Sequence, residues 1–177
     1  ATTDKAGLVA LKAVSDVDNR VTARSVGFAL GPRLNAAGRL GKADNGFHLL
    51  TSVDLKEAKE LAQELNHINQ ERKDIQKLVQ DEAEYLIGRE VNLVEDRVIV
   101  LASENFHSGV VGVVASRVVE KYFRPAVLIA LESGVGKGSG RSIPHFNLHR
   151  AFTECARHLT QFGGHAYAAG LTINENN

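Results

Sequence analysis

The segment from Ser133 to Ser142 reads Ser-Gly-Val-Gly-Lys-Gly-Ser-Gly-Arg-Ser and combines glycine with cationic and hydroxyl side chains. Backbone amides beside glycine can approach an anion closely, and Lys137 and Arg141 add positive charge, so the chemistry indicated is phosphate binding. The spacing fits neither the Walker loop nor the Gly-x-Gly-x-x-Gly fingerprint, which argues against ATP and NAD. We predict a glycine-rich turn with a short strand running through it, whose flexible backbone contacts phosphate. An inert hairpin is the alternative.

Two histidines lie where an anion could bind. His107 comes at the start of a predicted helix (109–123), whose free amides and dipole attract anions, although a lone histidine there is as often a cap or a surface residue. His165 follows Gly163 and Gly164 in a run of small residues, which leaves room for a ligand or another domain. His165 is therefore a better functional candidate than the histidines elsewhere in the chain.

Other residues give weaker signals. His145 and His149 have zinc-ligand spacing, but Pro144 and a predicted helix cap argue against a shared helix face, so no metal is predicted there. Asp16-Val-Asp18 is interpreted as a turn or a cap. No serine, cysteine or carboxylate pair forms a nucleophile or an acid–base set. The residues by themselves indicate anion binding without a complete catalytic site.

An alternation of strands and helices in residues 91–177 would position these side chains. Continuous apolar runs are typical of strands that are covered on both faces, and Asn147 is a plausible helix cap. The predicted elements are strands at 97–102, 126–131 and 171–173, and helices at 109–123 and about 148–159. We predict a small α/β domain.

A long amphipathic helix precedes this domain. Apolar residues recur with a 3.6-residue period from Leu55 to Ile87, Asp54 resembles a capping residue, and Gly88 would stop the helix. At 1.5 Å per residue the helix would span roughly 50 Å, which suits a bridge between two domains or a coiled-coil arm. Before it, we predict a short helix at 7–15 and a second short element at 22–30.

Composition narrows the class of protein. The 177 residues are 44% hydrophobic and carry 21 basic and 21 acidic side chains. The chain therefore has no net positive charge of the kind that would indicate a nucleic-acid partner. Two stretches contain basic residues and no acid: 31–42 and 133–150.

The single cysteine, Cys155, has an apolar helical setting that predicts a buried thiol in a reducing compartment. Without a membrane-length apolar run or a signal peptide, the protein is expected in the cytoplasm. The absence of methionine is compatible with excision from a longer protein.

Four motifs, taken together and in order, resemble those of RecJ-like single-strand-specific exonucleases in the DHH phosphoesterase superfamily. They are Gly31-Pro-Arg-Leu-Asn-Ala-Ala-Gly-Arg-Leu40, His107-Ser-Gly-Val-Val-Gly-Val-Val-Ala-Ser-Arg117, Gly138-Ser-Gly-Arg-Ser-Ile143 and Gly163-Gly-His-Ala-Tyr-Ala-Ala-Gly170. One departure is Phe106, where the family more often has tryptophan.

The resemblance implies a part of a longer enzyme. The family hydrolyses phosphodiesters from the 5′ end of single-stranded DNA in repair and recombination, with Mn²⁺ or Mg²⁺ activating water. The metal ligands belong to an N-terminal DHH domain whose motifs are absent here, so the fragment is expected to hold no metal and its own catalysis stays open. We divide the chain into the tail of that domain (1–45), the long connecting helix (46–90) and a DHH-associated substrate-binding domain (91–177).

The resemblance also implies roles for individual residues. Arg33, Asn35 and Arg39 should face the cleft between domains, and Ser139, Arg141 and Ser142 should hold the DNA backbone. Gly163, Gly164 and His165, with His107, should close on the substrate next to the metals. The expected partners are single-stranded DNA and the DHH domain of the same protein.

Two alternatives remain open. One is an oligoribonucleotide or cyclic-dinucleotide phosphodiesterase of the same superfamily, which shares the Gly-Gly-His segment but leaves the stretch from Arg33 to Arg39 less well explained. The other is a helical interaction module without a catalytic role, which leaves the glycine and histidine motifs unexplained.

Overall fold

The computed structural model describes residues 3–17, 20–40 and 44–177. Lys42, the last residue of the basic stretch 31–42, and Asp18, in the predicted turn, lie outside these ranges. The chain divides into two compact units, Ala1–Asp74 and Ile75–Asn177, and each is described by itself.

The first unit is helical. Its elements are α1 (Ala6–Val14), α2 (Ala23–Ser25), a π-helical turn (Val26–Leu30), α3 (Gly31–Arg39), α4 (Asp44–Thr51) and the start of α5. The short element predicted at 22–30 continues directly into α3, and Pro32 stands in the first turn of α3, where its missing N–H costs nothing. α1 and α4 pack backbone to backbone, since a Cβ at Gly7 would lie 1.9 Å from the Leu49 carbonyl oxygen.

The predicted long helix is confirmed as α5, Leu55–Glu90. Asp54 caps it through its Oδ1, which accepts a hydrogen bond from the Lys56 amide at 2.6 Å. The predicted stop at Gly88 is wrong, because a cost of about 0.5–1 kcal/mol for one helical glycine does not end a helix. The residues just before it, Leu86 and Ile87, are buried and hold the last turns in place.

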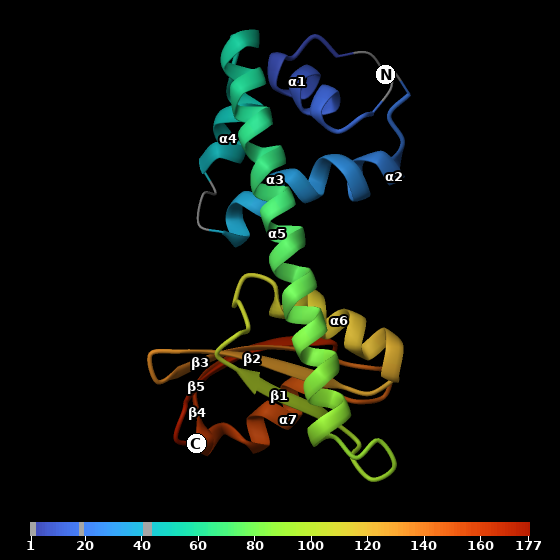
Figure 1. The fold of residues 1–177 in the computed structure, drawn as a ribbon, viewed down its shortest axis with the longest axis vertical. Helices are drawn as coiled ribbons and strands as arrows, with labels where there is room; N and C mark the ends of the chain where they lie inside the picture. The colour runs from blue at the N-terminus through green and yellow to red at the C-terminus, as the bar shows by residue number, and fades with distance from the viewer. Residues whose placement is uncertain (1–2, 18–19, 41–43) are drawn as a thin grey trace. The chain divides into compact units, whose positions relative to one another are not determined.

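The second unit contains a five-stranded mixed sheet, which confirms the predicted α/β class (Figure 1). Its strands are β1 (Ile99–Ser103), β2 (Ala126–Glu132), β3 (Val135–Arg141), β4 (Leu159–His165) and β5 (Ala168–Asn174). Their order in the sheet is β1-β2-β3-β5-β4. β1 and β2 are parallel, and the other neighbours are antiparallel.

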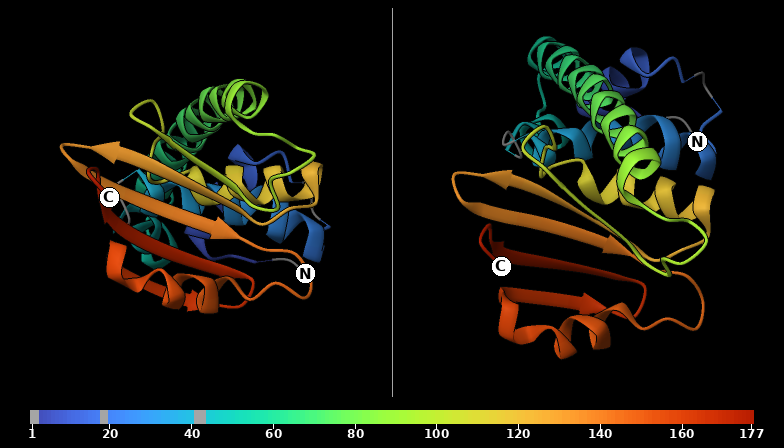
Figure 2. Two further views of the ribbon diagram at one scale, coloured as in Figure 1. Left: turned by 90° about the horizontal axis from the view of Figure 1, so that it is seen from below. Right: turned by 60° about the horizontal axis from the view of Figure 1, so that its bottom comes forward.

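Helices lie on both faces of this sheet (Figure 2). α6 (Val111–Tyr122) and the part of α5 after Asp74 pack on one face, where Leu101, Val114 and Leu128 are buried. α7 (Leu148–Glu154) packs on the other, against Val127 and Ile129. The central position of β2 explains its continuous apolar sequence.

The C-terminal part differs from its prediction. The helix that begins at Leu148, with Asn147 as its confirmed cap, ends at Glu154 instead of Leu159, because Leu159 already pairs with Ile173 as the start of β4. Cys155 is therefore exposed at the helix end, and the prediction of a buried thiol is wrong. The predicted strand 171–173 is confirmed within the longer β5.

A polar cluster fixes α6 against α5 within this unit. The Glu84 carboxylate accepts hydrogen bonds from Lys121 Nζ at 2.6 Å and from the Tyr122 hydroxyl at 2.5 Å. Burial alone would raise the pKa of Glu84, but these hydrogen bonds and the Lys121 charge outweigh it and hold that pKa below its ordinary value. The cluster sets the position of α6, whose start borders the site described next.

Candidate nucleic-acid interface

The glycine-rich segment is a strand with two different faces. Along β3, Gly136, Gly138 and Gly140 point to the α7 side, because they pair with Leu131, Ile129 and Val127. A Cβ at Gly138 would lie 2.9 Å from Leu171 Cδ1, so this face has room only for hydrogen. The interpretation of these glycines as a flexible backbone that approaches an anion is therefore wrong.

The opposite face of β3 carries the polar side chains. Lys137, Ser139 and Arg141 alternate with the glycines and point to the α6 side. Across the sheet, the pairing places Arg141 in a row with Ala168 and His165, Ser139 with Gly170 and Gly163, and Lys137 with Thr172 and Gln161. Directly paired residues project from the same face of an antiparallel sheet. We call these nine residues the open face.

The open face is uncovered over β5 and β4. A Cβ added at Gly163 would meet no atom within 4 Å, and a Cβ at Gly170 would meet only a carbonyl oxygen at 3.6 Å. Gly163, His165 and Gly170 are exposed. Lys137 and Arg141 supply the charges of this face, and its nine residues include no carboxylate. These nine residues therefore carry two positive charges and no negative one, and a phosphate backbone could approach them closely.

α6 packs against the side chains of Arg141 and Ser139 on the same face of the sheet. Arg141 Nη1 donates to Ser139 Oγ at 3.0 Å and to the Gly140 carbonyl at 2.8 Å. On α6, a Cβ at Gly112 would lie 2.8 Å from Ser139 Oγ and 2.9 Å from Arg141 Nη2. Gly112 therefore provides the space in which these two side chains pack.

His165 and His107 are held in the same way. Nδ1 of His165 accepts a hydrogen bond from the Tyr167 amide at 3.3 Å, and Nδ1 of His107 accepts one from the Gly109 amide at 3.0 Å. A neutral imidazole whose Nδ1 is an acceptor carries its proton on Nε2. Each ring thus has a donor available for a phosphate oxygen.

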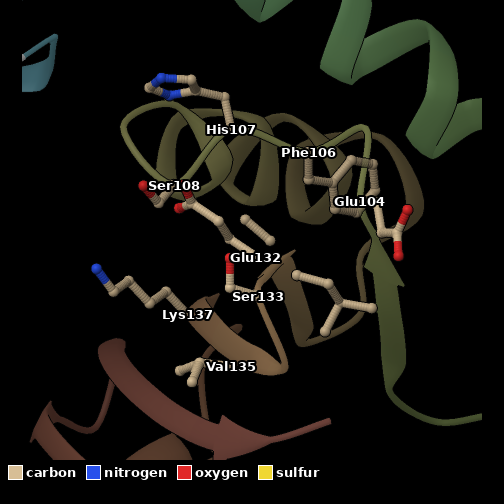
Figure 3. Close-up of a pocket in the computed structure, with 10 residues that line it drawn as sticks. Glu104, Phe106, His107, Ser108, Glu132, Ser133, Val135 and Lys137 are labelled. Carbon is tan, nitrogen blue, oxygen red and sulfur yellow. The ribbon is translucent and has the colours of Figure 1, made fainter.

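His107 does not belong to the row of His165. It precedes a turn that leads into α6 and lines a cavity of about 520 Å³ together with Ser108 and Lys137 (Figure 3). Figure 3 shows these three side chains along one side of the cavity, with Phe106 on the other. His165 instead shares its row with Arg141. His107 therefore lies near Lys137 of β3, whereas His165 lies on β4, two strands from Arg141 in the same row.

Ser142 and Gly164 have structural surroundings that the sequence did not indicate. The Ser142 hydroxyl donates to the Phe146 carbonyl at 2.8 Å, and the Ser142 amide donates to the Tyr167 carbonyl at 3.0 Å. Gly164 has φ 140°, and a Cβ there would lie 2.4 Å from the Ala168 carbonyl oxygen, so only glycine fits. Both residues shape the edge of the open face.

In the first unit, Arg33 differs from Asn35 and Arg39 in how far its side chain is exposed to solvent. Arg33 donates to Asn66 Oδ1 at 2.8 Å, to the Ala29 carbonyl at 2.8 Å and to the Val14 carbonyl at 3.0 Å. Its partial burial lowers its pKa, against the opposing charge of Asp16. Asn35 and Arg39 are exposed. Asn35 and Arg39 are accordingly better placed than Arg33 to meet a ligand.

Neither a metal centre nor a membrane span is found in the described parts of the chain. Within them, no three His, Cys, Asp or Glu side chains form a group that could hold a metal ion. The described residues therefore offer no set of ligands that fits the Mn²⁺ or Mg²⁺ which the resemblance assigns to the DHH domain. No helix in the same ranges is long and apolar enough to cross a membrane.

Comparison with known proteins gives consistent matches. The DHHA1 domain model matches residues 95–177. The single-stranded-DNA-specific exonuclease RecJ of Bacillus subtilis (strain 168) is 42% identical over 97% of this chain and 22% of the relative. RecJ of Escherichia coli (strain K12) is 41% identical over 93% of this chain and 30% of the relative. The chain thus spans less than a third of the length of these two relatives.

Solved structures agree. The crystal structure of RecJ in complex with Mg²⁺ from Thermus thermophilus matches with a TM-score of 0.85 and 32% identity, over 98% of this chain and 26% of that chain. A structure of exonuclease RecJ bound to manganese matches with a TM-score of 0.80 and 34% identity, over 97% of this chain and 42% of that chain. From the motifs, the domain model and these relatives together, the chain belongs to the RecJ family, in the part of it that includes the DHHA1 domain.

Proposed function

We propose that this chain grips the backbone of single-stranded DNA as part of a cytoplasmic exonuclease that hydrolyses phosphodiesters from the 5′ end, in DNA repair and recombination. The Mn²⁺ or Mg²⁺ ions of that reaction would be held by a DHH domain of the same protein. One observation carries the proposal: two separate motifs, Gly138–Ile143 and Gly163–Gly170, contribute to one open, positive sheet face.

On this proposal the open face binds phosphates without reading bases. Arg141 and Lys137 would pair with phosphate oxygens, and Nε2 of His165 would donate to another. Gly163 and Gly170 would let the strand lie close to the backbone of β4 and β5. His107 and Ser108 would extend the contact beside Lys137. We propose phosphate contacts for Asn35 and Arg39 of the first unit separately. Contacts of this kind suit a nuclease that accepts any sequence.

The proposal is tested by fluorescence anisotropy with a labelled single-stranded oligonucleotide at low and moderate salt. We expect salt-sensitive binding that Arg141→Ala weakens and that a duplex of the same length does not match. Arg89→Ala is the matched control, because it removes an arginine whose side chain is 61% exposed on α5 and which is not one of the nine residues of the open face. Equal losses in the two variants, or equal affinity for duplex, would contradict the proposal.

The same titration with other nucleotides, together with sedimentation, distinguishes the proposed function from the two alternatives. A phosphodiesterase for short ribonucleotides would bind a di- or triribonucleotide, or a cyclic dinucleotide, more tightly than the DNA strand. A helical interaction module would form dimers in sedimentation experiments and would show no dependence on Arg141.

A further inference from the structure

A small aromatic cavity lies directly beyond the end of the open face. Its volume is about 280 Å³, and its lining residues are His145, Phe146, Asn147, Ala166 and Tyr167. The last row of the open face is Arg141, Ala168 and His165. Ala166 follows His165, Tyr167 precedes Ala168, and the loop that contributes His145 begins after Arg141. The lining residues of the cavity therefore adjoin, along the chain, the last row of the open face.

Hydrogen bonds hold the two sides of the cavity together. The Ser142 amide donates to the Tyr167 carbonyl at 3.0 Å, and the Leu148 amide donates to the Ala166 carbonyl at 3.0 Å. Within the loop, the Ser142 hydroxyl donates to the Phe146 carbonyl at 2.8 Å. Within this loop His145 has φ 72°, a backbone conformation that a non-glycine residue adopts at a cost. The cavity is thus a preformed site whose walls do not need to be ordered by a ligand.

The chemistry of the cavity suits a flat ring. The Tyr167 side chain is large and apolar, yet 58% exposed, while Phe146 is partly buried against the core under α7. Exposed aromatic side chains beside a cationic groove are the surface on which unpaired nucleobases stack. His145 offers a second ring and a polar edge. A base can stack in this way only when it is not already paired within a duplex.

We propose that this cavity, with Tyr167 as its stacking surface, takes one unpaired nucleobase of the strand whose backbone lies on the open face. The subsite rests on the proposed function, and it adds a reason for single-strand preference that phosphate contacts alone do not supply. Stacking is tolerant of sequence, because every base has an aromatic face.

The experiment compares two oligomers of equal length and charge, an oligothymidine and an abasic sugar-phosphate strand, by anisotropy with the 177-residue chain. We expect Tyr167→Ala to weaken binding of the oligothymidine by about 5- to 150-fold, the range of one stacked base, and to leave the abasic strand unaffected. Tyr167→Phe should retain the affinity of the native chain. Tyr85→Ala is the matched control, because Tyr85 is equally exposed at 58% but lies on α5.

A second readout uses the protein's own fluorescence. The chain has three tyrosines and no tryptophan, so quenching by a stacked base is visible directly. Oligothymidine should quench the native chain, the abasic strand should not, and Tyr167→Phe should remove most of the quenching.

The outcomes separate the two proposals. Suppose that Arg141→Ala weakens binding of both strands, whereas Tyr167→Ala weakens binding of neither strand, or of both equally. The base subsite is then wrong, and the proposal that the open face binds the DNA backbone is retained. If neither strand depends on Arg141, the proposed function fails, and the subsite fails with it.

Discussion

Arg33 and Arg141 both lie in acid-free stretches, yet their guanidinium groups meet different partners. Arg33 donates to one side-chain and two backbone acceptors that join α1, α3 and α5. Arg141 lies on an open sheet face beside Ser139. The resemblance implied a place in the substrate site for both residues, but neither charge nor spacing reveals which acceptors the fold brings within reach. The histidines illustrate the same limit: His165 follows its glycines in the sequence, but only strand pairing reveals the row that it shares with Arg141.

At this scale we predict that Arg33→Met lowers the free energy of unfolding by about 1–3 kcal/mol, because partly buried acceptors lose a charged donor. Urea unfolding followed by circular dichroism at 222 nm measures the change. Arg24→Met is the control, because Arg24 is exposed and contacts only the Phe28 ring at 5.9 Å among its described interactions. Comparable losses in the two variants would show that Arg33 has no special structural role.

Among the elements, α5, α6 and the apolar strands were predictable, and a short strand was predicted where β3 lies, but α3, α4 and β4 were not predicted. The 3.6-residue period extends over most of α5, and β2 is a continuous apolar run, so each carries its own signal. β3 and β4 contain few residues with strand propensity. β3 forms because Leu171 and Ile129 fill the space above its glycines, and that packing depends on residues distant in sequence.

Two helical glycines give a prediction at this scale. Gly88→Ala on α5 should raise the free energy of unfolding by about 0.5–1 kcal/mol, since its Cβ would meet no atom within 4 Å. Gly112→Ala on α6 should instead displace Ser139 and Arg141 and weaken binding of single-stranded DNA about as much as Arg141→Ala does. Urea unfolding and anisotropy, applied to both variants, measure the two effects. Unchanged DNA affinity in Gly112→Ala would contradict the role of Gly112 in positioning Arg141.

For the whole molecule, the division into two units has a spectroscopic consequence. Tyr85, Tyr122 and Tyr167 all lie in the second unit, whereas helices occur in both. The two units have separate apolar cores, to which α5 contributes residues on either side of Asp74.

We therefore predict that tyrosine fluorescence and circular dichroism at 222 nm give different urea transitions. Separate cores open in separate cooperative steps, and the tyrosines report only the second unit. The circular dichroism curve should contain an additional transition at lower urea concentration, from the helical first unit. Superimposable curves would mean that α5 couples the two units into one cooperative structure.

The alternation of β3 also bears on how this protein could be engineered. Removing or inserting a single residue within the strand would exchange its two faces, placing Lys137, Ser139 and Arg141 under α7 and the glycines toward α6. A change of two residues would preserve the alternation and shift only the hairpin at Gly134. Sequence libraries that vary the length of this segment should therefore move in steps of two, because odd steps bury cations and even steps do not.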